Sequence, residues 1–304
     1  MFREAQALRR LAFLALSAFW CAGSGAAEKL ELDGVGYSRS VRSLGKGASL
    51  VSVRLSGLLP CEVRMAVFDL KENPALEMHF RYGPAAGRMR ATPETMALET
   101  ARKFGGEALA AINGDFFLYE KKTEKESAPA RPFGVTYEDG FLHDVGCWRP
   151  DGYSVVARLR DGAYAFGKLT SEIGATTNLF CDGKAVSSAI RVWNRPLVGG
   201  KIIPSGQLNC YPDDAQRCYP RTFVGLGTNR VVFLVADARQ PLWSWGLDSA
   251  QASELLRREG CTDAGQFDGG GSTALWAKGS YANRPSDGKP RPVANGLVVI
   301  EERR

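Results

Sequence analysis

The hydrophobic residues of this chain occur in short runs, and turn residues separate one run from the next. Runs rich in Val, Leu and Phe lie at Ser49–Leu55, Val63–Leu70, Leu76–Tyr82, Gly152–Leu159 and Gly162–Phe166. Runs of this length are typical of β-strands. Asp139-Gly140 and Asp161-Gly162 indicate hairpin turns, because glycine supplies the positive φ that such turns require. The pattern predicts a mixed, largely antiparallel twisted β-sheet.

Two segments carry the marks of helices. The first is expected to begin after Thr92, which can cap it, with Pro93 at the first helical position, and to end at Gly105. The second is expected from about Asp248 to Arg258, before Gly260. A sheet flanked by a few helices makes the predicted fold class α+β. No long linker divides the chain, so we expect a single domain.

The first 27 residues have the order of a secretory signal peptide: a basic start, an apolar run at Leu11–Cys21 and small residues up to Ala27. The apolar run is shorter than the roughly 20 residues that cross a bilayer, so we expect no permanent membrane anchor. Cleavage before Glu28 would give a secreted or periplasmic protein. The remainder is expected to comprise an N-terminal β-rich part, residues 28–90, and a core, residues 91–304.

Charge and cysteine content narrow the class of protein. The formal net charge of +6 falls to +4 once the three basic residues and one acidic residue of the signal segment are removed. Such a mild excess does not indicate a nucleic-acid partner. Seven cysteines become six without Cys21, and an even number in an exported chain fits disulfide bonds. We predict a Cys210–Cys218 disulfide, because these cysteines bracket a polar turn.

The sharpest chemical signal is Asp268, which three glycines follow. Successive glycines suit a backbone that turns sharply or approaches a ligand closely, and their amides can form an anion-binding nest. The segment therefore places one carboxylate beside several donors: Gly269, Gly270, Gly271, Ser272 and Thr273. The alternative is a tight turn in which Asp268 caps its own backbone.

A second segment, Asn113-Gly114-Asp115, has the same context. Each segment follows a helix and an apolar strand, expected at Ala108–Ile112 and Thr262–Phe267. We therefore expect two strand ends to deliver polar groups to one crevice. A common Asn-Gly turn is the alternative.

Further polar residues adjoin strands. Arg221-Thr222 precedes the strand Phe223–Leu226, where the guanidinium can fork onto a phosphate. Asp237 and Arg239 follow the strand Phe233–Ala236. The closing strand Gly296–Ile300 has three polar residues before it: Arg284, Arg291 and Asn295. A surface position is the alternative for Arg221, and a solvated position is the alternative for Asp237 and Arg239.

Few cofactor chemistries fit the chain. It has two histidines, His79 and His143, without metal-ligand spacing, and no Gly-x-Ser-x-Gly or P-loop motif. The sequence therefore requires no cofactor. Oxygen ligands from Asp115, Asp237 and Asp268 could still gather a divalent cation, Ca²⁺ or Mg²⁺.

Taken in order, these segments resemble the phosphodiester glycosidase family over roughly residues 91–301. The matching pieces are Ala111-Ile-Asn-Gly-Asp-Phe-Phe117, Pro220-Arg-Thr222, Val235-Ala-Asp-Ala-Arg-Gln240, Gln266-Phe-Asp-Gly-Gly-Gly-Ser-Thr273 and Arg291-Pro-Val-Ala-Asn-Gly-Leu297. Two departures, Ala238 for the usual glycine and Phe267 for an aliphatic residue, leave the charged positions unchanged.

The resemblance implies hydrolysis of the bond between a sugar anomeric carbon and a phosphodiester oxygen, in a small or polymeric glycan-phosphate substrate. Asp268 or Asp115 would activate water or attack the sugar, and Asn113 and Asn295 would position hydroxyl groups. The phosphate-binding candidates are Gly114, Arg221, Thr222, Asp237, Arg239, Gly269, Gly270, Gly271, Ser272, Thr273 and Arg291. The alternatives are another phosphodiester or cell-wall glycan hydrolase, and a non-catalytic glycan-phosphate binding protein.

Overall fold

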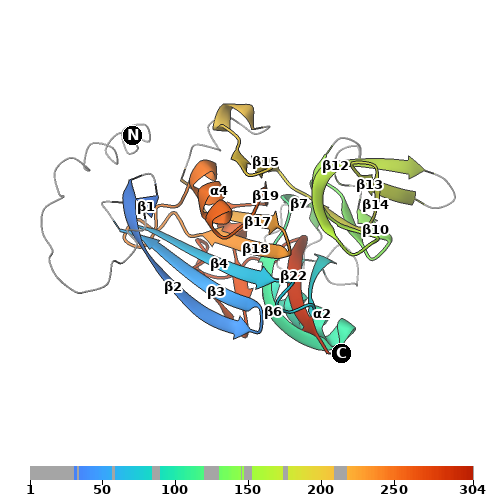
Figure 1. The fold of residues 1–304 in the computed structure, drawn as a ribbon, viewed down its shortest axis with the longest axis horizontal. Helices are drawn as coiled ribbons and strands as arrows, with labels where there is room; N and C mark the ends of the chain where they lie inside the picture. The colour runs from blue at the N-terminus through green and yellow to red at the C-terminus, as the bar shows by residue number, and fades with distance from the viewer. Residues whose placement is uncertain are drawn as a thin grey trace, which may run out of the picture.

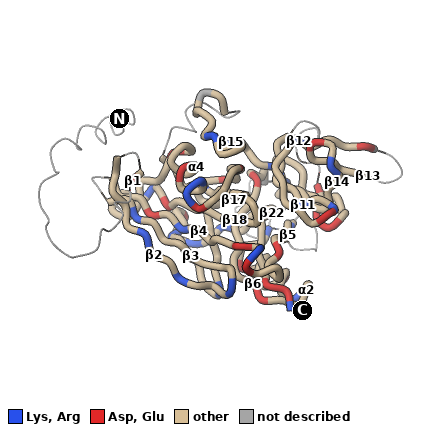
Figure 2. The backbone as a smooth tube through the Cα atoms, viewed as in Figure 1, with Lys and Arg blue, Asp and Glu red and all other residues tan. Residues whose placement is uncertain are grey.

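The computed structural model describes residues 31–32, 34–56, 59–83, 90–119, 130–144, 146, 153–173, 177–208 and 218–303. The predicted signal peptide and Cys210 lie outside the described residues. Within the described part, no helix is both long and apolar enough to cross a membrane. Acidic and basic residues are interspersed along it (Figure 2).

The largest sheet has nine strands in the order β1-β2-β3-β4-β18-β17-β19-β15-β16 (Figure 1). Its strands are β1 (Glu31–Leu32), β2 (Val35–Gly45), β3 (Ala48–Leu55), β4 (Cys61–Asp69), β15 (Asn194–Val198), β16 (Lys201–Ile202), β17 (Arg221–Gly227), β18 (Arg230–Ala236) and β19 (Asp263–Gln266). The N-terminal strands β1 to β4 thus share a sheet with strands from the second half of the chain.

A second sheet has five strands in the order β21-β20-β6-β22-β5. They are β5 (Leu76–Tyr82), β6 (Gly106–Asn113), β20 (Leu275–Ala277), β21 (Ser280–Tyr281) and β22 (Asn295–Glu302). A two-stranded ribbon, β7 (Phe117–Tyr119) with β8 (Ala130–Pro132), follows β6 in the chain.

The third sheet has six strands in the order β10-β9-β14-β11-β12-β13. They are β9 (Thr136–Glu138), β10 (Phe141–Asp144), β11 (Ser154–Leu159), β12 (Tyr164–Ile173), β13 (Thr177–Cys181) and β14 (Lys184–Arg191). Because β13 also pairs with β14, strands β11 to β14 close on themselves around a small core of their own.

The described chain has two α-helices, α2 (Pro93–Phe104) and α4 (Ser249–Arg258), and two 3₁₀ turns, Ser205–Gln207 and Gly270–Ser272. Thr92 caps α2 by accepting a hydrogen bond from the Thr95 amide, and Gly105 ends it in the left-handed conformation. Asp248 and Gln251 form a capping box at the start of α4. Both predicted helices are thereby confirmed, with their caps.

The core is layered. The nine-stranded and five-stranded sheets pack face to face through a cluster that includes Phe68, Phe233, Phe80 and Leu297, and residues of the six-stranded sheet close one end of it. The helix α4 packs on the outer face of the nine-stranded sheet. The helix α2 covers the outer face of the five-stranded sheet. The two sheets are thus held between the two helices.

The predicted strands are present, but every pairing between described strands is antiparallel. The fold is β-rich, rather than α+β with a mixed sheet. The reason lies in the crossovers: α2 joins β5 to β6 with β22 between them, and α4 joins β18 to β19 with β17 between them. The strands within each pair run in the same direction without bonding to each other.

The hairpin predictions are confirmed. Asp139 and Gly140 both have positive φ, at 49° and 83°, and connect β9 to β10. Gly162 has φ 90° between β11 and β12. The described cysteines, Cys61, Cys181, Cys218 and Cys261, form no disulfide bond with one another. The predicted Cys210–Cys218 bond stays a prediction, since Cys210 lies outside the described residues.

Candidate functional site

The predicted site residues meet at one edge of the two packed sheets. The strands β6, β18 and β19 end there, and β17 and β22 begin there, since Asn113 lies opposite Gly296, Phe223 opposite Gln266, and Arg221 opposite Ala236. The six-stranded sheet adds the end of β14. The expectation that two strand ends share one site therefore agrees with the topology.

Asn113 joins the two glycine-containing segments. Its Nδ2 donates to the Asp268 carbonyl at 2.8 Å, and its Oδ1 accepts from the Thr222 hydroxyl at 2.8 Å and from the Ala274 amide at 3.2 Å. Both Asn113 and Thr222 are completely buried. The amide therefore fixes the frame of the site, and these bonds occupy the groups that were predicted to bind substrate.

Asn295 also fixes the frame of the site, by hydrogen bonds to Asp115 and Thr136. Its Oδ1 accepts from the Asp115 amide at 2.8 Å, and its Nδ2 donates to the Thr136 hydroxyl at 2.7 Å. A Cβ atom at Gly114 would collide with this Oδ1, so the close approach requires glycine there. In turn the Gly114 carbonyl accepts from the Asp268 amide at 3.0 Å. The two carboxylate-bearing turns are thus held by backbone contacts to each other.

Asp115 is buried and held on every side. Its Oδ1 accepts from the Phe116 amide at 2.8 Å and its Oδ2 from the Gly134 amide at 2.7 Å. Arg191, at the end of β14, donates to Oδ1 at 3.2 Å. Burial raises the pKa of Asp115 to about 6, against the opposing charge of Arg191. This carboxyl group therefore ionises at higher pH than an ordinary aspartate but is mostly ionised at pH 7.

Arg191 is the site residue that the sequence did not reveal. Its guanidinium lies over the rings of Trp193 and Tyr153, with 4.8 Å and 5.3 Å from Cζ to the ring centroids. Phe116 packs against Trp193 with 4.8 Å between centroids. Arg191 belongs to no sequence motif. Its contact with Asp115 could not be predicted, because it depends on how the fold places the end of β14 beside the end of β6. The result is an aromatic wall beside Asp115.

Asp268 is partly exposed, in contrast to Asp115. Burial raises its pKa to about 7. The Ser272 hydroxyl, the Arg291 charge and the Gly269 amide oppose that rise, whereas the negative charge of Asp115 adds to it. The two carboxyl groups are therefore close enough to influence each other's ionisation, and Asp268 is the residue of the two with surface exposed to solvent.

The glycine turn packs tightly onto neighbouring groups. The Gly270 amide donates to the Pro220 carbonyl at 3.0 Å, and the Gly269 amide donates to the Asp268 carboxylate. A Cβ atom at Gly271 would collide with the guanidinium of Arg291. The predicted anion nest is thus largely occupied by the protein itself, and the glycines serve close approach.

Two guanidinium groups flank this turn. Arg291 donates to the Ser272 hydroxyl at 3.3 Å and pairs with Asp287 at 2.6 Å, while its side chain is 33% exposed. Arg239 lies beside Gly270, packs over the ring of Tyr219 at 5.3 Å, and has the uncommon φ of 61°. Both charges are available at the surface of the site.

Three other residues that were predicted to bind substrate are buried inside the protein. Asp237 is buried and accepts from the Trp243 indole at 3.0 Å, the Asn283 amide at 2.9 Å and the Arg284 backbone amide. Arg221 is buried and donates to the Leu247 carbonyl at 3.4 Å, on the face of β17 opposite to Thr222. Thr273 is buried, and its hydroxyl makes no hydrogen bond with a described residue.

The cation site considered for Asp115, Asp237 and Asp268 has no geometric support. Among the described residues, the group of carboxylates and histidine whose ligand atoms lie within 4.8 Å of one another is elsewhere in the fold. The donors around Asp237 are neutral groups that already occupy both of its oxygens.

The arrangement defines a class of site. Asp268, a partly exposed residue whose carboxyl group has a pKa near 7, adjoins a buried second carboxyl group, two guanidiniums and an aromatic wall. Perturbed carboxyl groups that lie beside cations are typical of sites for acid–base or nucleophilic chemistry on anionic substrates. The arrangement therefore makes this edge of the sheets the candidate active site.

The family model for phosphodiester glycosidases matches residues 106–300, and the chain belongs to this family. The matched range begins at β6 and ends within β22, so it contains every residue described at the site. The family is one of glycosidase-type hydrolases.

Individual relatives are distant. The chain is 25% identical over 173 residues to the SPbeta prophage-derived uncharacterized protein YomE of Bacillus subtilis. The aligned part is 50% of this chain and 26% of that protein. Solved structures with the same fold include a predicted exported protein from Burkholderia pseudomallei (TM-score 0.66, 14% identity, 91% of this chain and 100% of that chain). Another is the zebrafish N-acetylglucosamine-1-phosphodiester alpha-N-acetylglucosaminidase catalytic domain, auto-inhibited by its pro-peptide (TM-score 0.59, 17% identity, 88% of each chain).

Proposed function

We propose that this protein hydrolyses the bond between a sugar anomeric carbon and a phosphodiester oxygen, releasing free sugar and a phosphate monoester. The observation that carries the proposal is Asp268: a partly exposed residue with a raised pKa, beside buried Asp115 and Arg291, within the segment matched by the family. The likeness to the zebrafish enzyme supports the fold on which such a reaction takes place.

The charges suit this reaction. Departure of a sugar from phosphate builds oxocarbenium character on the sugar and negative charge on the phosphate. A phosphate monoester has a second pKa near 6, so it leaves with less protonation than an alcohol needs. Arg239 and Arg291 can stabilise the departing anion, because guanidinium forks match phosphate oxygens. Strong general-acid assistance is therefore unnecessary.

The two carboxyl groups have different surroundings and hence different proposed roles. Asp268 is the group that attacks the anomeric carbon or activates water, since it is partly exposed. Asp115 acts as a positioning residue: its oxygens are held by two backbone amides and Arg191, and its charge keeps the pKa of Asp268 high. The aromatic wall of Trp193 and Tyr153 offers an apolar surface to a sugar ring.

The test is hydrolysis of a panel of sugar-1-phosphodiesters by the parent and by Asp268→Asn. We expect the parent to release free sugar and Asp268→Asn to lose at least about a hundredfold in kcat/KM, the scale on which loss of a catalytic carboxylate acts. Asp263→Asn is the matched control, because Asp263 lies on β19 but pairs with Arg195, outside the site. Full activity in folded Asp268→Asn would contradict the assignment.

Labelled water identifies the bond that breaks. Cleavage at the anomeric carbon places the oxygen of labelled water on the sugar. Cleavage at phosphorus places it on the phosphate and would mean a phosphodiesterase. No release from any substrate by folded protein would favour a glycan-phosphate binding protein instead.

We also infer that the chain is exported and processed before Glu28. The order of basic, apolar and small residues in its first 27 positions supports this inference. The shared fold of a predicted exported protein from Burkholderia pseudomallei fits with it.

A further inference from the structure

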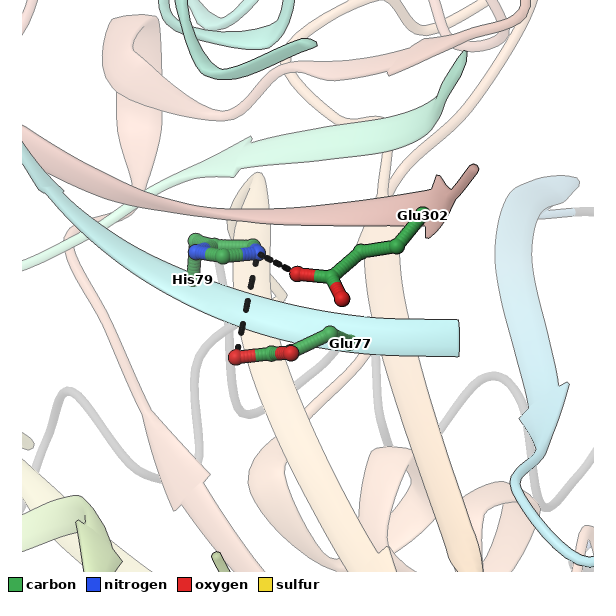
Figure 3. A group of neighbouring side chains, drawn as sticks. All are labelled: Glu77, His79 and Glu302. Atoms are coloured by element: carbon green, nitrogen blue, oxygen red, sulfur yellow. Dashed lines mark ion pairs between the residues drawn. The ribbon is translucent and has the colours of Figure 1, made fainter. Parts of the chain in front are cut away.

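A second cluster of polar side chains lies at the far end of the five-stranded sheet from the site. It comprises Glu77 and His79 on β5 and Glu302 at the end of β22 (Figure 3). Asn295 and Glu302 are the two ends of β22, and seven residue steps of about 3.3 Å put them roughly 23 Å apart. The cluster is therefore separate from Asp268 and its neighbours.

His79 is the member that distinguishes this cluster from an ordinary ion pair. Its side chain is 96% buried, and its Nε2 atom has no hydrogen-bond partner among the described residues. The ring packs on Phe104 of α2 with 4.1 Å between centroids, and Nε2 faces the two carboxylates at 4.0 Å and 3.9 Å. These separations are too long for hydrogen bonds. A buried polar atom aimed at two carboxylates without bonding either one indicates a missing ligand.

We propose that Glu77, His79 and Glu302 bind a divalent transition-metal ion of the zinc class. One imidazole nitrogen with two carboxylate oxygens is a donor set that such ions accept, whereas Ca²⁺ and Mg²⁺ prefer oxygen alone. A cation at this point would also be attracted by both carboxylates, although Arg158 already pairs with Glu77.

The geometry permits an ion with small adjustments. The three ligand atoms lie within 4.8 Å of one another. A tetrahedral zinc ion with bonds of about 2.0–2.1 Å requires ligand atoms roughly 3.4 Å apart. The two separations from His79 Nε2, 4.0 Å and 3.9 Å, must therefore each close by about half an ångström. Both glutamates are partly exposed, at 20% and 37%, and can make this movement, while His79 stays fixed against Phe104.

Arg158 on β11 is the competing cation. It forms an ion pair with Glu77 Oε1, the oxygen that also faces His79. Binding of a metal ion must either displace this guanidinium or use the other oxygen of Glu77. Arg158 therefore weakens the site, and its removal is a specific test of the ligand assignment.

The ion would act on the fold rather than on the reaction. It would link the last residue of β22 to β5, the edge strand of its sheet, which pairs with β22 alone among the described strands. The expected consequence is a higher melting temperature with the metal present, because binding to the folded state alone stabilises it.

The experiment is titration of the whole exported chain with Co²⁺, a spectroscopic substitute for zinc, and with Zn²⁺ by calorimetry. Because the chain has two histidines, His143→Phe is a matched control for His79→Phe, which keeps an aromatic ring against Phe104. We expect one equivalent of Co²⁺, with the visible absorption of a low-coordinate site, in the parent and His143→Phe but not in His79→Phe. Binding that survives in His79→Phe, or no binding by the parent, would overturn the proposal.

The Arg158→Ala variant gives the second measurement. We expect it to bind Zn²⁺ at least about tenfold more tightly than the parent, since the competing charge is gone. An unchanged affinity would show that the ion does not use Glu77 and would also overturn the assignment. Sugar release is no part of either readout, so the result stands whatever the outcome of the hydrolysis assay.

Discussion

Asp268 controls the pH response of the proposed reaction. A carboxyl group must be ionised to attack the sugar or to accept a proton from water. Burial and the charge of Asp115 hold its pKa near 7, three pH units above the ordinary 3.8. The fraction of active enzyme should therefore grow over the neutral range, rather than over the acid range where free carboxyl groups ionise.

We predict that kcat/KM rises with pH and levels off above about 7. In Asp115→Asn this rise should move to lower pH by about half a unit or more, because the variant removes a neighbouring negative charge and leaves Arg191 unpaired. The measurement is a pH–rate profile of both proteins on one sugar-1-phosphodiester. A profile that falls through pH 7 would instead make Asp268 a general acid.

The same carboxyl group affects stability. Folding raises its pKa from 3.8 to about 7, so between these values the folded protein retains a proton that the unfolded chain has released. The contribution of Asp268 to the free energy of unfolding therefore falls as pH rises from about 4 to about 7. Asp268→Asn carries no such penalty.

We predict that Asp268→Asn gains stability relative to the parent as pH rises from 4 to 8. Denaturant unfolding of both proteins at the two pH values measures the difference. Asp263→Asn is the control and should not show this trend. A constant difference between parent and Asp268→Asn would show that the pKa of Asp268 is not raised.

Sequence reasoning at this scale proposed both carboxyl groups, because glycines beside an aspartate indicate close backbone approach, and the structure brings the two together. It did not reveal Arg191, whose partner lies 76 positions away and is brought near only by the third sheet. It also could not tell which face of β17 each residue occupies. Thr222 faces Asn113, so its neighbour Arg221 faces Leu247.

At the scale of elements, the site depends on the meeting of β6 and β19, which Asn113 joins. The side chain of Asn113 bonds to three partners: the partly exposed Asp268 carbonyl, the buried Thr222 hydroxyl and the buried Ala274 amide. Removing it leaves all three without their hydrogen bond, at a cost of about 1–3 kcal/mol for each buried group.

Asn113→Ala should therefore lower the free energy of unfolding by about 3 kcal/mol or more. Activity should fall as well, because the turn that carries Asp268 loses its anchor. Asn178→Ala is a suitable control, since Asn178 is partly exposed and accepts one bond from Arg160. Chemical denaturation of the parent, Asn113→Ala and Asn178→Ala measures the free energy of unfolding of each. If Asn113→Ala loses no more of it than Asn178→Ala does, the anchoring role is contradicted.

Apolar strands such as β4 and β18 were predictable, as were both helices with their caps. The sequence pattern missed β2, whose Tyr37–Ser43 stretch alternates serine with arginine and is exposed along most of its length. This segment forms a strand because it pairs with β3, and it has no apolar run from which a strand could be predicted. The order of strands within the sheets was likewise beyond the pattern, because it depends on which strand lies between the ends of each helical crossover.

For the whole molecule, the first 27 residues make a prediction that is independent of the fold. Expressed with its full sequence in a host that secretes proteins, the chain should be recovered outside the cytoplasm with Glu28 as its first residue. Mass spectrometry of the intact protein measures this. Recovery with Met1 intact, in the cytoplasm or in the membrane fraction, would contradict processing.

The contacts between the Gly114 and Gly269 turns have a consequence for how such a protein can diversify. The position of Asp268 is specified mostly by main-chain atoms and by Asn113 and Asn295, none of which depend on the surrounding surface. The groups that would meet a sugar, Trp193 and Tyr153, lie in connections beside the six-stranded sheet: Tyr153 precedes β11 and Trp193 follows β14. Substrate preference can therefore change by substitution in these connections while the reactive centre is inherited unaltered.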